Sequence, residues 1–409
     1  MTGGYEMVIF WIFAGITIFG LIGYMAQVVA VHRTMKTKGL GRAEGHPNAG
    51  YRPPISIIKP LKGLDDNLFD NIESFCFQDY PQYEILFAVQ DYNDPAYKIV
   101  RKIKDKHPDR NISIIVEKCD DGLNPKVINL IPAYRYAKYP FILISDSNVM
   151  VDRHYLGEIV SHMENPDVGL VTNVIRGIRG RTIGSIFENL HLNSFIAGSV
   201  CFLDRFLKMP CVIGKSMLMR RSDLDAIGGF VAVKDVLAED YIIGKKIHDR
   251  GRKVVLSNHV IDNVNEYWGI KRFLNRHTRW GKLRWKIGGI RYLPELMGNA
   301  VFMSSMPLVM VDLSRLTVSF AVLVSSIKIA GDLYIGRKLK TGMNPFFYLL
   351  SPIKDLIVGI IWFVPILSNT IAWRGNRYLI GKDSVLSPYQ ENIWSWRYRF
   401  MDVIRAWVV

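Results

Sequence analysis

Cysteine is scarce in this sequence, with four residues in 409, and no two of them form a CxxC pair. This spacing excludes the common zinc-binding motifs, and an RNP-like RNA-binding signature is also absent. We therefore expect free thiols in a reducing compartment and no nucleic-acid partner. The four thiols belong to Cys76, Cys119, Cys201 and Cys211.

Charge is missing altogether from Val8–Val31, a run of 24 residues. Since about 20 apolar residues span the hydrocarbon core of a bilayer, residues 1–33 are predicted to hold a transmembrane helix. The run is too long for a signal-peptide core, and no small-residue cleavage site follows it. His32, Arg33 and Lys36 come directly after it. The positive-inside rule therefore predicts that the next domain is cytosolic.

Acidic residues are outnumbered by basic ones, 37 to 52, so the formal net charge is +15 although 49% of the residues are hydrophobic. A chain that is both apolar and basic is typical of a membrane protein whose surface faces anionic phospholipid or a phosphorylated substrate. We therefore predict an integral membrane protein with a phospholipid membrane as one of its partners.

Residues 34–54 are rich in Gly and Pro and predict a linker. Beyond them, strand-like runs alternate with helical patterns, which is typical of an α/β domain with a mostly parallel sheet between helices. We assign residues 55–262 to this domain. The predicted strands are Ile55–Lys59, Glu84–Gln90, Ile112–Val116, Phe141–Ser145, Gly169–Thr172 and Ser216–Arg220. The predicted helices are Asn67–Phe75, Tyr97–Lys106, Lys126–Ala137, Tyr155–Met163, Arg221–Ile227 and 239–250.

Polar side chains follow three of the predicted strands, in Lys59–Lys62, Asp91–Asp94 and Asp146–Asn148. In an open α/β sheet, ligands bind at the carboxyl ends of the strands, so we expect these loops to converge. A carboxylate such as that of Asp146 is costly there unless a cation or hydrogen-bond donors meet it. Two interpretations stay open: a ligand of a divalent metal that carries a diphosphate, or an ordinary turn or helix-capping aspartate.

The stretch Thr182–Pro210 interrupts the alternation, because it is rich in Phe and Leu with scattered charges. It predicts either an amphipathic helix, against the membrane or beside an acceptor, or a core helix. Further on, Asp240 opens a predicted helix, where the helix dipole favours an acidic residue whatever its function. The sequence Gly214-Lys215-Ser216 is no phosphate-binding P-loop, since that motif requires Gly at the position of Met209.

Basic and aromatic residues gather in Tyr267–Ile290, within a segment that we assign to residues 263–295. Such a composition suits the lipid headgroup layer. Arg276 and Arg279 lie three residues apart, so on a helix they share a face, and two adjacent guanidinium groups suit a diphosphate. The alternative is a solvated basic stripe that faces lipid.

Three further apolar stretches follow: Ala300–Val311, Leu316–Ile329 and Pro345–Ile371. The first two predict either a hairpin or one long helix with a polar pair inside. The third contains Pro352 and Pro365 and is re-entrant, interfacial or spanning. We therefore predict two to three membrane helices in residues 296–373 and a C-terminal tail over residues 374–409.

Several motifs, taken in order, resemble the ceramide glucosyltransferases, family 21 of the glycosyltransferases. The resemblance covers nearly the whole chain, and its specificity comes from the ordered set rather than from any single motif. The motifs are KPLKGLDDNLFDNIESFCFQDYPQYEILFAVQDYNDPA (Lys59–Ala96), NPKVINL (Asn124–Leu130), CVIGKSMLMR (Cys211–Arg220), AEDY (Ala238–Tyr241), RHTRWGKLR (Arg276–Arg284) and NTIAWRGNRY (Asn369–Tyr378).

The resemblance implies a GT-A fold, which is Rossmann-like, and an inverting transfer of a hexose, expected to be glucose, from a UDP-sugar to a lipid hydroxyl. It also implies a divalent cation, Mg²⁺ or Mn²⁺. The family pattern is three spaced acidic sites followed by (Q/R)xxRW. Asp91 then contacts the nucleoside, Asp146 binds the metal and diphosphate, and Asp240 is the catalytic base. Arg276, Arg279 and Trp280 match the last motif.

The expected chemistry independently requires these residue types. An inverting transfer is a single displacement, so it needs one carboxylate to take the proton of the acceptor hydroxyl. The leaving UDP needs positive charge from a metal and from arginine. The residues expected to bind the donor are Asp91, Asp94, Lys59, Lys126, Asn129, Asp146, Arg276, Arg279 and Trp280; to bind the metal, Asp146 and Asn148; to bind the acceptor, Glu239, Trp280 and His191.

The acceptor is the least defined partner, since ceramide and diacylglycerol both present a primary hydroxyl above two chains. The sugar is glucose, galactose or glucuronic acid. A processive polysaccharide synthase shares the three acids and the arginine motif. Such an enzyme threads its polymer through a bundle of membrane helices, for which three or four apolar segments are too few. A basic membrane scaffold without activity would be expected to lack one of the acids. The expected location is a bacterial inner membrane, or the Golgi or endoplasmic reticulum of a eukaryote.

Overall fold

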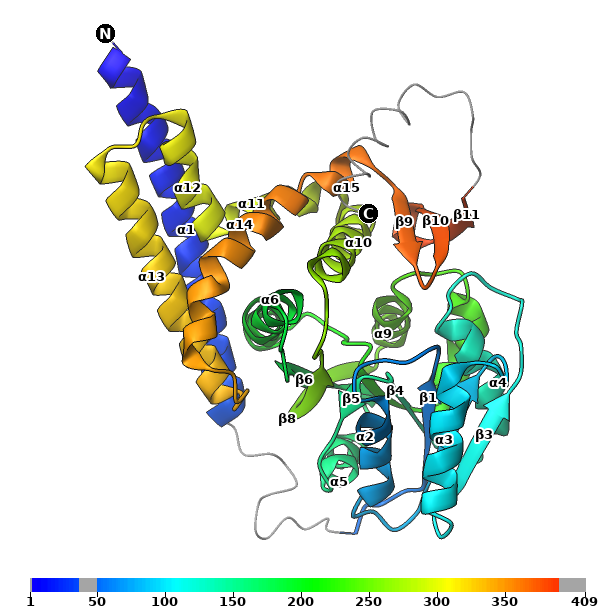
Figure 1. Cartoon of the computed structure of the whole chain (residues 1–409). Coiled ribbons are helices and arrows are strands. Elements are labelled where there is room, and N and C mark those ends of the chain that lie inside the picture. The colour runs from blue at the N-terminus through cyan, green and yellow to red at the C-terminus, as the bar shows by residue number, and fades with distance from the viewer. Residues whose placement is uncertain (1, 37–49, 390–409) are drawn as a thin grey trace. The chain divides into compact units, whose positions relative to one another are not determined.

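The computed structural model describes residues 2–36 and 50–389 (Figure 1). Most of the predicted linker lies outside the described residues, and so does the predicted tail from residue 390 on. The chain divides into two compact units. The helical unit comprises Met1–His32, Gly180–Gly198 and Tyr267–Val409, and the sheet unit comprises Arg33–Arg179 and Ser199–Glu266.

The sheet unit is built on one mixed sheet of eight strands, in the order β3-β2-β1-β4-β7-β6-β8-β5. The first four strands in this order are parallel, and β6 and β8 are parallel to each other, which confirms the predicted α/β class. The antiparallel strands are β7, between β4 and β6, and β5 at the edge. The strands are β1 (Ile55–Pro60), β2 (Tyr83–Val89), β3 (Ile112–Val116), β4 (Phe141–Ser145), β5 (Val149–Met150), β6 (Val168–Ile178), β7 (Ser216–Arg220) and β8 (Lys253–Val264).

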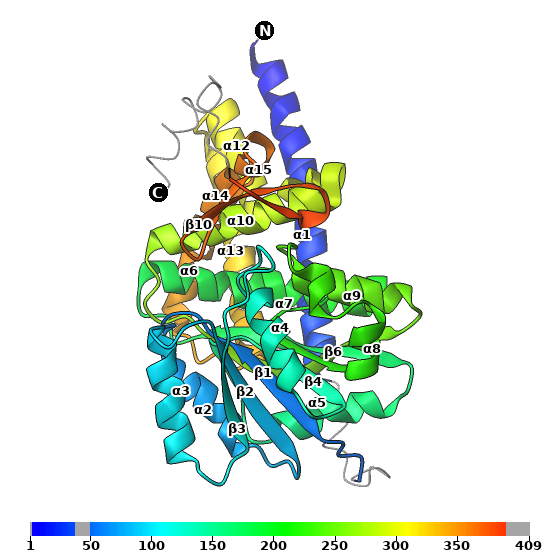
Figure 2. The ribbon, with the colours of Figure 1, turned by 90° about the vertical axis from the view of Figure 1, so that its right-hand side faces the viewer.

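Helices cover both faces of this sheet, so its central strands are buried and largely apolar. Every residue of β1 and β4 is buried, as expected for parallel strands between two helical layers. Figure 2 shows α3 on one side of β1 and β2 and α4 on the other. One core cluster joins α4, α8 and α9 to the sheet, for example through Leu130, Leu224 and Ile243. The helices are α2 (Leu68–Glu73), α3 (Pro95–Lys106), α4 (Val127–Tyr136), α5 (Tyr155–Ser161), α8 (Arg221–Ala226) and α9 (Glu239–Asp249).

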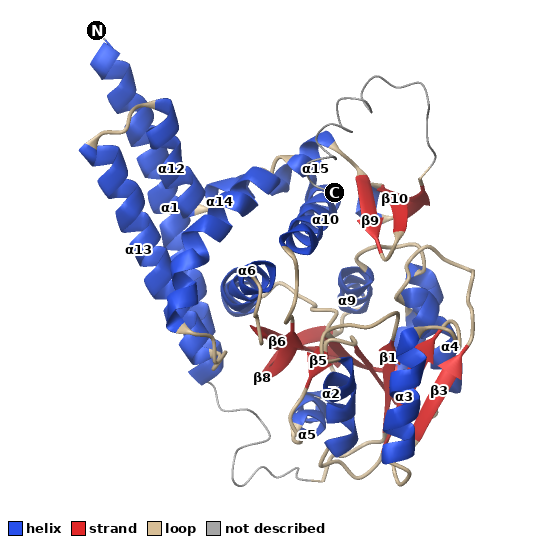
Figure 3. Cartoon of the chain, in the orientation of Figure 1, coloured by secondary structure: helices blue, strands red, loops and turns tan. Residues whose placement is uncertain are grey.

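The helical unit combines long apolar helices with a small antiparallel sheet, in the order β11-β10-β9 (Figure 3). Its helices are α1 (Thr2–Lys36), α6 (Ile183–His191), α10 (Ile270–Gly288), α11 (Pro294–Met297), α12 (Ala300–Met310), α13 (Arg315–Lys338), α14 (Ser351–Ile361) and α15 (Val364–Leu367). Helix α7 (Ala197–Phe202) continues from α6 through a π-helical turn at Leu192–Ile196 and lies at the border between the units. The strands are β9 (Thr370–Trp373), β10 (Asn376–Ile380) and β11 (Leu386–Pro388).

Four helices in the described part of the chain are long and apolar enough to cross a membrane: Gly4–Lys36, Ile183–Leu207, Arg315–Lys338 and Pro345–Leu367. Three of them fall on predicted apolar stretches. Ala300–Val311 and Leu316–Ile329 form two helices rather than one, because Ser314 caps the start of α13. For the start of Thr182–Pro210 the core-helix interpretation holds, since Gly184 to His191 are all buried.

A cluster of charged side chains lies inside the apolar part of the helical unit. The Asp332 carboxylate accepts hydrogen bonds from the Tyr24 hydroxyl at 2.7 Å and the Lys328 ammonium at 2.5 Å. Asp355 pairs with Lys354 at 2.6 Å and with Lys328 at 3.5 Å. These five residues connect α1, α13 and α14, and each charge has a partner of opposite sign, as buried charges require.

Candidate active site

The carboxyl ends of β1 and β4 lie side by side, as the pairing of Ile58 with Ile144 requires. Lys59 at the end of β1 is fully buried, and its Nζ donates to the Ser145 hydroxyl at 3.3 Å and the Asp146 carbonyl at 3.1 Å. The same Nζ lies 3.5 Å from the centre of the Phe75 ring. Burial lowers the pKa of Lys59, and the nearby Asp146 charge opposes this shift. Lys59 therefore links the carboxyl ends of β1 and β4 by buried hydrogen bonds.

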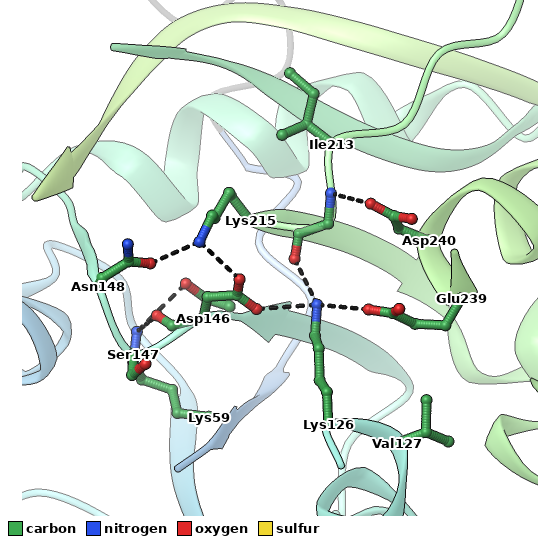
Figure 4. A network of polar contacts seen from close by, with 12 residues as sticks. Lys59, Lys126, Val127, Asp146, Ser147, Asn148, Ile213, Lys215, Glu239 and Asp240 are labelled. Atoms are coloured by element: carbon green, nitrogen blue, oxygen red, sulfur yellow. Dashed lines mark hydrogen bonds and ion pairs between the residues drawn. The ribbon is translucent and has the colours of Figure 1, made fainter. Parts of the chain in front are cut away.

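Asp146 lies between two ammonium groups (Figure 4). Its Oδ1 is 2.9 Å from Lys126 Nζ, and its Oδ2 is 2.9 Å from Lys215 Nζ. Burial would raise the pKa of the Asp146 carboxyl, but the two ammonium groups hold it well below its usual range. Cations do meet this carboxylate, but both belong to the protein, so its predicted role as a ligand of a metal that carries a diphosphate stays a prediction.

Lys126 connects the loops that form the site. It precedes α4, and its Nζ contacts Asp146, the Glu239 carboxylate at 2.9 Å and the Gly214 carbonyl at 2.8 Å. Although burial opposes the charged form, these acidic neighbours raise its pKa above the ordinary value. Glu239 also accepts a hydrogen bond from the Asn124 side chain at 3.2 Å. Lys126 and Glu239 are thus held by ionic contacts, as a preorganised site requires.

Asp240 lies in the first turn of α9, and its side chain is only partly buried. Its Oδ2 accepts a hydrogen bond from the Gly214 N–H at 2.9 Å, and its Oδ1 accepts one from its neighbour Tyr241 at 2.8 Å. Burial, and then the Glu239 charge, raise the pKa of Asp240 to about 6, with Lys126 and the two N–H groups opposing. A carboxylate with such a pKa is suited to accept a proton near neutral pH.

The residues around Asp146 do not fit a divalent cation as they are arranged. Both carboxylate oxygens bind ammonium groups, and the Asn148 side-chain oxygen accepts a hydrogen bond from Lys215 at 2.7 Å. Among the described residues, no group of three or more His, Cys, Asp or Glu side chains is placed to hold a metal ion. The predicted metal ligands Asp146 and Asn148 do lie together, but Lys215 takes the position between them.

The other predicted donor residues of the sheet unit have structural contacts. Asp91 is exposed after β2, and its carboxylate accepts a hydrogen bond from Asn93 N–H at 2.8 Å. Asp94 caps α3 and accepts hydrogen bonds from Gly63 N–H at 2.9 and 3.1 Å, which joins the loops after β1 and β2. The Asn129 side chain donates to the Leu61 carbonyl at 2.8 Å. Their roles toward a donor stay predictions.

The predicted arginine motif lies on α10 in the helical unit. The Arg276 Nε is 3.3 Å from the fully buried Glu188, and its guanidinium carbon lies 4.3 Å from the centre of the Trp280 ring. The Arg279 guanidinium carbon lies 5.3 Å from the centre of the Trp373 ring. Arg276 and Trp280 therefore form one packed group, while Arg279 contacts the small sheet. Their roles toward donor and acceptor stay predictions.

His191 is buried at the end of α6, and among the residues that the structure describes neither of its ring nitrogens has a hydrogen-bond partner. Its ring centre lies 4.3 Å from that of His277, which in turn is 3.0 Å from Glu188. The sequence singled out His191 only loosely for the acceptor, and nothing in its packing tests that role.

Lys215 is the site residue that the sequence did not reveal. Strand β7 runs antiparallel to β4 with Ser216 opposite Ser145, so the residue before β7 lies next to the residue after β4. The strand Ser216–Arg220 is predictable, but its place beside β4 and its direction are not. Gly214 lies within the motif CVIGKSMLMR, but the motif does not reveal its contacts: its N–H donates to Asp240, and its carbonyl accepts from Lys126.

Comparisons with known proteins place this chain in a family. The family model Glycosyl transferase family 21 matches residues 15–386. Ceramide glucosyltransferase 3 of Caenorhabditis elegans is 29% identical over 348 residues, which are 82% of this chain and 74% of the relative. Ceramide glucosyltransferase 1 of the same organism is 35% identical over 251 residues, which are 60% of this chain and 52% of the relative.

Among solved structures, the mannosyltransferase PcManGT from Pyrobaculum calidifontis, in complex with GDP-Man and Mn²⁺, shares the fold. Its TM-score is 0.52 at 19% sequence identity, over 87% of this chain and 99% of the other. This similarity confirms the predicted fold class, the GT-A type with a mostly parallel sheet. It concerns the fold alone, since the identity is low.

Proposed function

Because this chain belongs to glycosyl transferase family 21, and is thus a membrane-associated glycosyltransferase, we propose that it transfers glucose from UDP-glucose to the primary hydroxyl of ceramide with inversion. Ceramide is preferred to diacylglycerol because relatives over most of the chain are ceramide glucosyltransferases. The catalytic domain is proposed to face the cytosol, since Arg33 and Lys36 end α1.

A single observation carries the proposed chemistry: the loop at Gly214 connects the two carboxylates, because its N–H binds Asp240 and its carbonyl binds Lys126, which also contacts Asp146. Asp240 is the proposed base, because its pKa of about 6 lets it take the proton of the acceptor hydroxyl at neutral pH. Lys126 and Lys215 are the proposed partners of the diphosphate, whose negative charge grows as the sugar leaves. A divalent cation at Asp146 would also supply positive charge there, but it would first have to displace Lys215.

The proposal is tested by incubating the purified full-length protein with UDP-glucose, UDP-galactose and UDP-glucuronic acid, with ceramide and diacylglycerol offered together. We expect glucosylceramide as the main product by mass spectrometry and a β anomer by NMR. A glycosylated diacylglycerol would refute the acceptor. A polymer, or UDP release without any glycolipid, would refute the assignment as a whole.

Activity is expected to depend on pH through Asp240. The base must be deprotonated, and burial raises its pKa to about 6, so kcat/KM should be level above about pH 7 and fall about tenfold per pH unit below about pH 5. The profile is measured between pH 4.5 and 9 with stability checked at each pH. A level rate down to pH 4.5 would contradict a base with this pKa.

Substitution of Gly214 tests the position of the Asp240 carboxylate. A Cβ at residue 214 would lie 2.6 Å from Asp240 Oδ2 and 3.0 Å from Asp240 Cβ, so Asp240 must move in Gly214→Ala. We expect kcat to fall by about tenfold or more, because small displacements of a catalytic group are costly. The matched control is Gly157→Ala in α5, where the nearest atom lies 3.7 Å from the added Cβ. Equal kcat in both variants would contradict the positioning role.

A further inference from the structure

Lys215 lies where two side-chain oxygens converge. Its Nζ is 2.9 Å from Asp146 Oδ2 and 2.7 Å from Asn148 Oδ1 (Figure 4). The backbone fixes this placement, because β7 pairs antiparallel with β4 and brings Lys215 opposite Asp146. The Lys215 side chain is 15% exposed, so the contact lies within the protein.

An oxygen pair of this kind, at the carboxyl end of a strand, is what a hard divalent cation would bind. Such an ion needs a distance of about 2.0–2.6 Å from each oxygen, so it would overlap with the Lys215 ammonium. The remaining oxygen of the carboxylate offers no alternative, because Asp146 Oδ1 binds Lys126 at 2.9 Å. A metal and Lys215 cannot both occupy this position.

The Asp146 carboxylate already has two cationic partners. Lys126 Nζ and Lys215 Nζ each lie 2.9 Å from one of its oxygens, so two ammonium groups meet a single carboxylate. A divalent cation would add further positive charge next to these two lysines, which is unfavourable in a partly buried site. A diphosphate, in contrast, is negatively charged, and its oxygens can accept hydrogen bonds from the ammonium groups.

We propose that Lys215 is a built-in cation, which occupies the metal position between Asp146 and Asn148 and, with Lys126, receives the diphosphate of the donor. Metal then binds only by displacing Lys215, and donor binding does not require it. The diphosphate part rests on the proposed function, whereas the competition between Lys215 and a metal does not.

The first test measures Mn²⁺ binding to the full-length protein in detergent by electron paramagnetic resonance, with the metal alone as the probe. We expect Lys215→Met to bind Mn²⁺ at least about tenfold more tightly than the unmodified chain, because a positive charge has left the position. Adding Asp146→Asn to this variant should remove the gain. Equal affinity in the unmodified and Lys215→Met proteins, or a gain that survives Asp146→Asn, would overturn the proposal.

Folding of each variant is checked by its thermal transition, and Lys215→Gln replaces Lys215→Met if the latter shows no cooperative transition.

The second test needs no variant: UDP binding to the unmodified protein is measured by calorimetry in EDTA and in Mn²⁺. We expect affinities within about tenfold of each other, since two ammonium groups already face the diphosphate. Binding that appears only with Mn²⁺ would overturn the proposal. If UDP binds in neither condition, the proposed donor is wrong, and the Mn²⁺ comparison still decides the role of Lys215.

Discussion

Asp240→Asn is expected to lower kcat by about 100-fold or more, because a positioned base contributes about 10²–10⁴-fold to a proton transfer. The variant keeps the shape of the side chain, and its amide oxygen can still accept the hydrogen bond from Gly214 N–H. We therefore expect UDP binding within a few-fold of the unmodified protein. Initial rates with the lipid acceptor and calorimetry with UDP measure the two effects separately.

The matched control for this substitution is Asp249→Asn at the other end of α9. Its side chain is 59% exposed and contacts only the neighbouring His248 among the ion pairs of the described residues. We expect unchanged kcat there. If Asp240→Asn also keeps its turnover, Asp240 is not the base. If both turnover and UDP binding are lost together, the substitution has disturbed the site rather than the proton transfer.

Lys126→Met is expected to destabilise the sheet unit by about 3–5 kcal/mol, as is typical when one partner of a buried ion pair is removed. Lys126 is the common partner of Asp146 and Glu239, and each would be left with one ionic contact fewer. The midpoint of thermal unfolding should fall accordingly. The control is Lys118→Met, whose pair with Asp120 is largely exposed, so its effect should stay within about 1 kcal/mol.

The same variant has a second consequence that a purely structural role would not produce. The Lys126 charge lowers the pKa of Asp240, so its removal should raise that pKa further above its ordinary value. The acid limb of the activity profile should then move to higher pH. A destabilised protein with an unshifted profile would show that Lys126 supports the fold but does not act on the base.

Much of the sheet unit is predictable because most of its strands are short, largely apolar runs. Strands β3, β4 and β7 have the predicted bounds. Strand β1 ends one residue later than predicted, and β2 begins and ends one residue earlier. The strand β8 was not predicted, since Ser257, Asn258 and His259 interrupt its apolar pattern. The small sheet β9–β11 was missed for a related reason: it follows an apolar stretch whose membrane-like composition hides the change to strands.

The candidate site was predictable where strand ends alone determine position. Lys59 and Asp146 come together because β1 and β4 are parallel neighbours, which the alternation of strands and helices indicates. Lys215 required the antiparallel insertion of β7, and the ion pairs of Lys126 required the loop geometry around Gly214. Such contacts depend on side-chain packing between distant segments, which no local pattern contains.

The buried contact between Tyr24 and Asp332 has a consequence for how the protein is made. The two residues are 308 positions apart, so α1 leaves the ribosome long before α13 and α14. Until α13 has been made, the Tyr24 hydroxyl has no Asp332 to bind. Asp332 and Asp355 each have a lysine close by in the sequence, Lys328 and Lys354, which is made together with them. Assembly of the three helices is thus expected to be a late step of biogenesis, before which each acid can already form an ion pair with its neighbouring lysine.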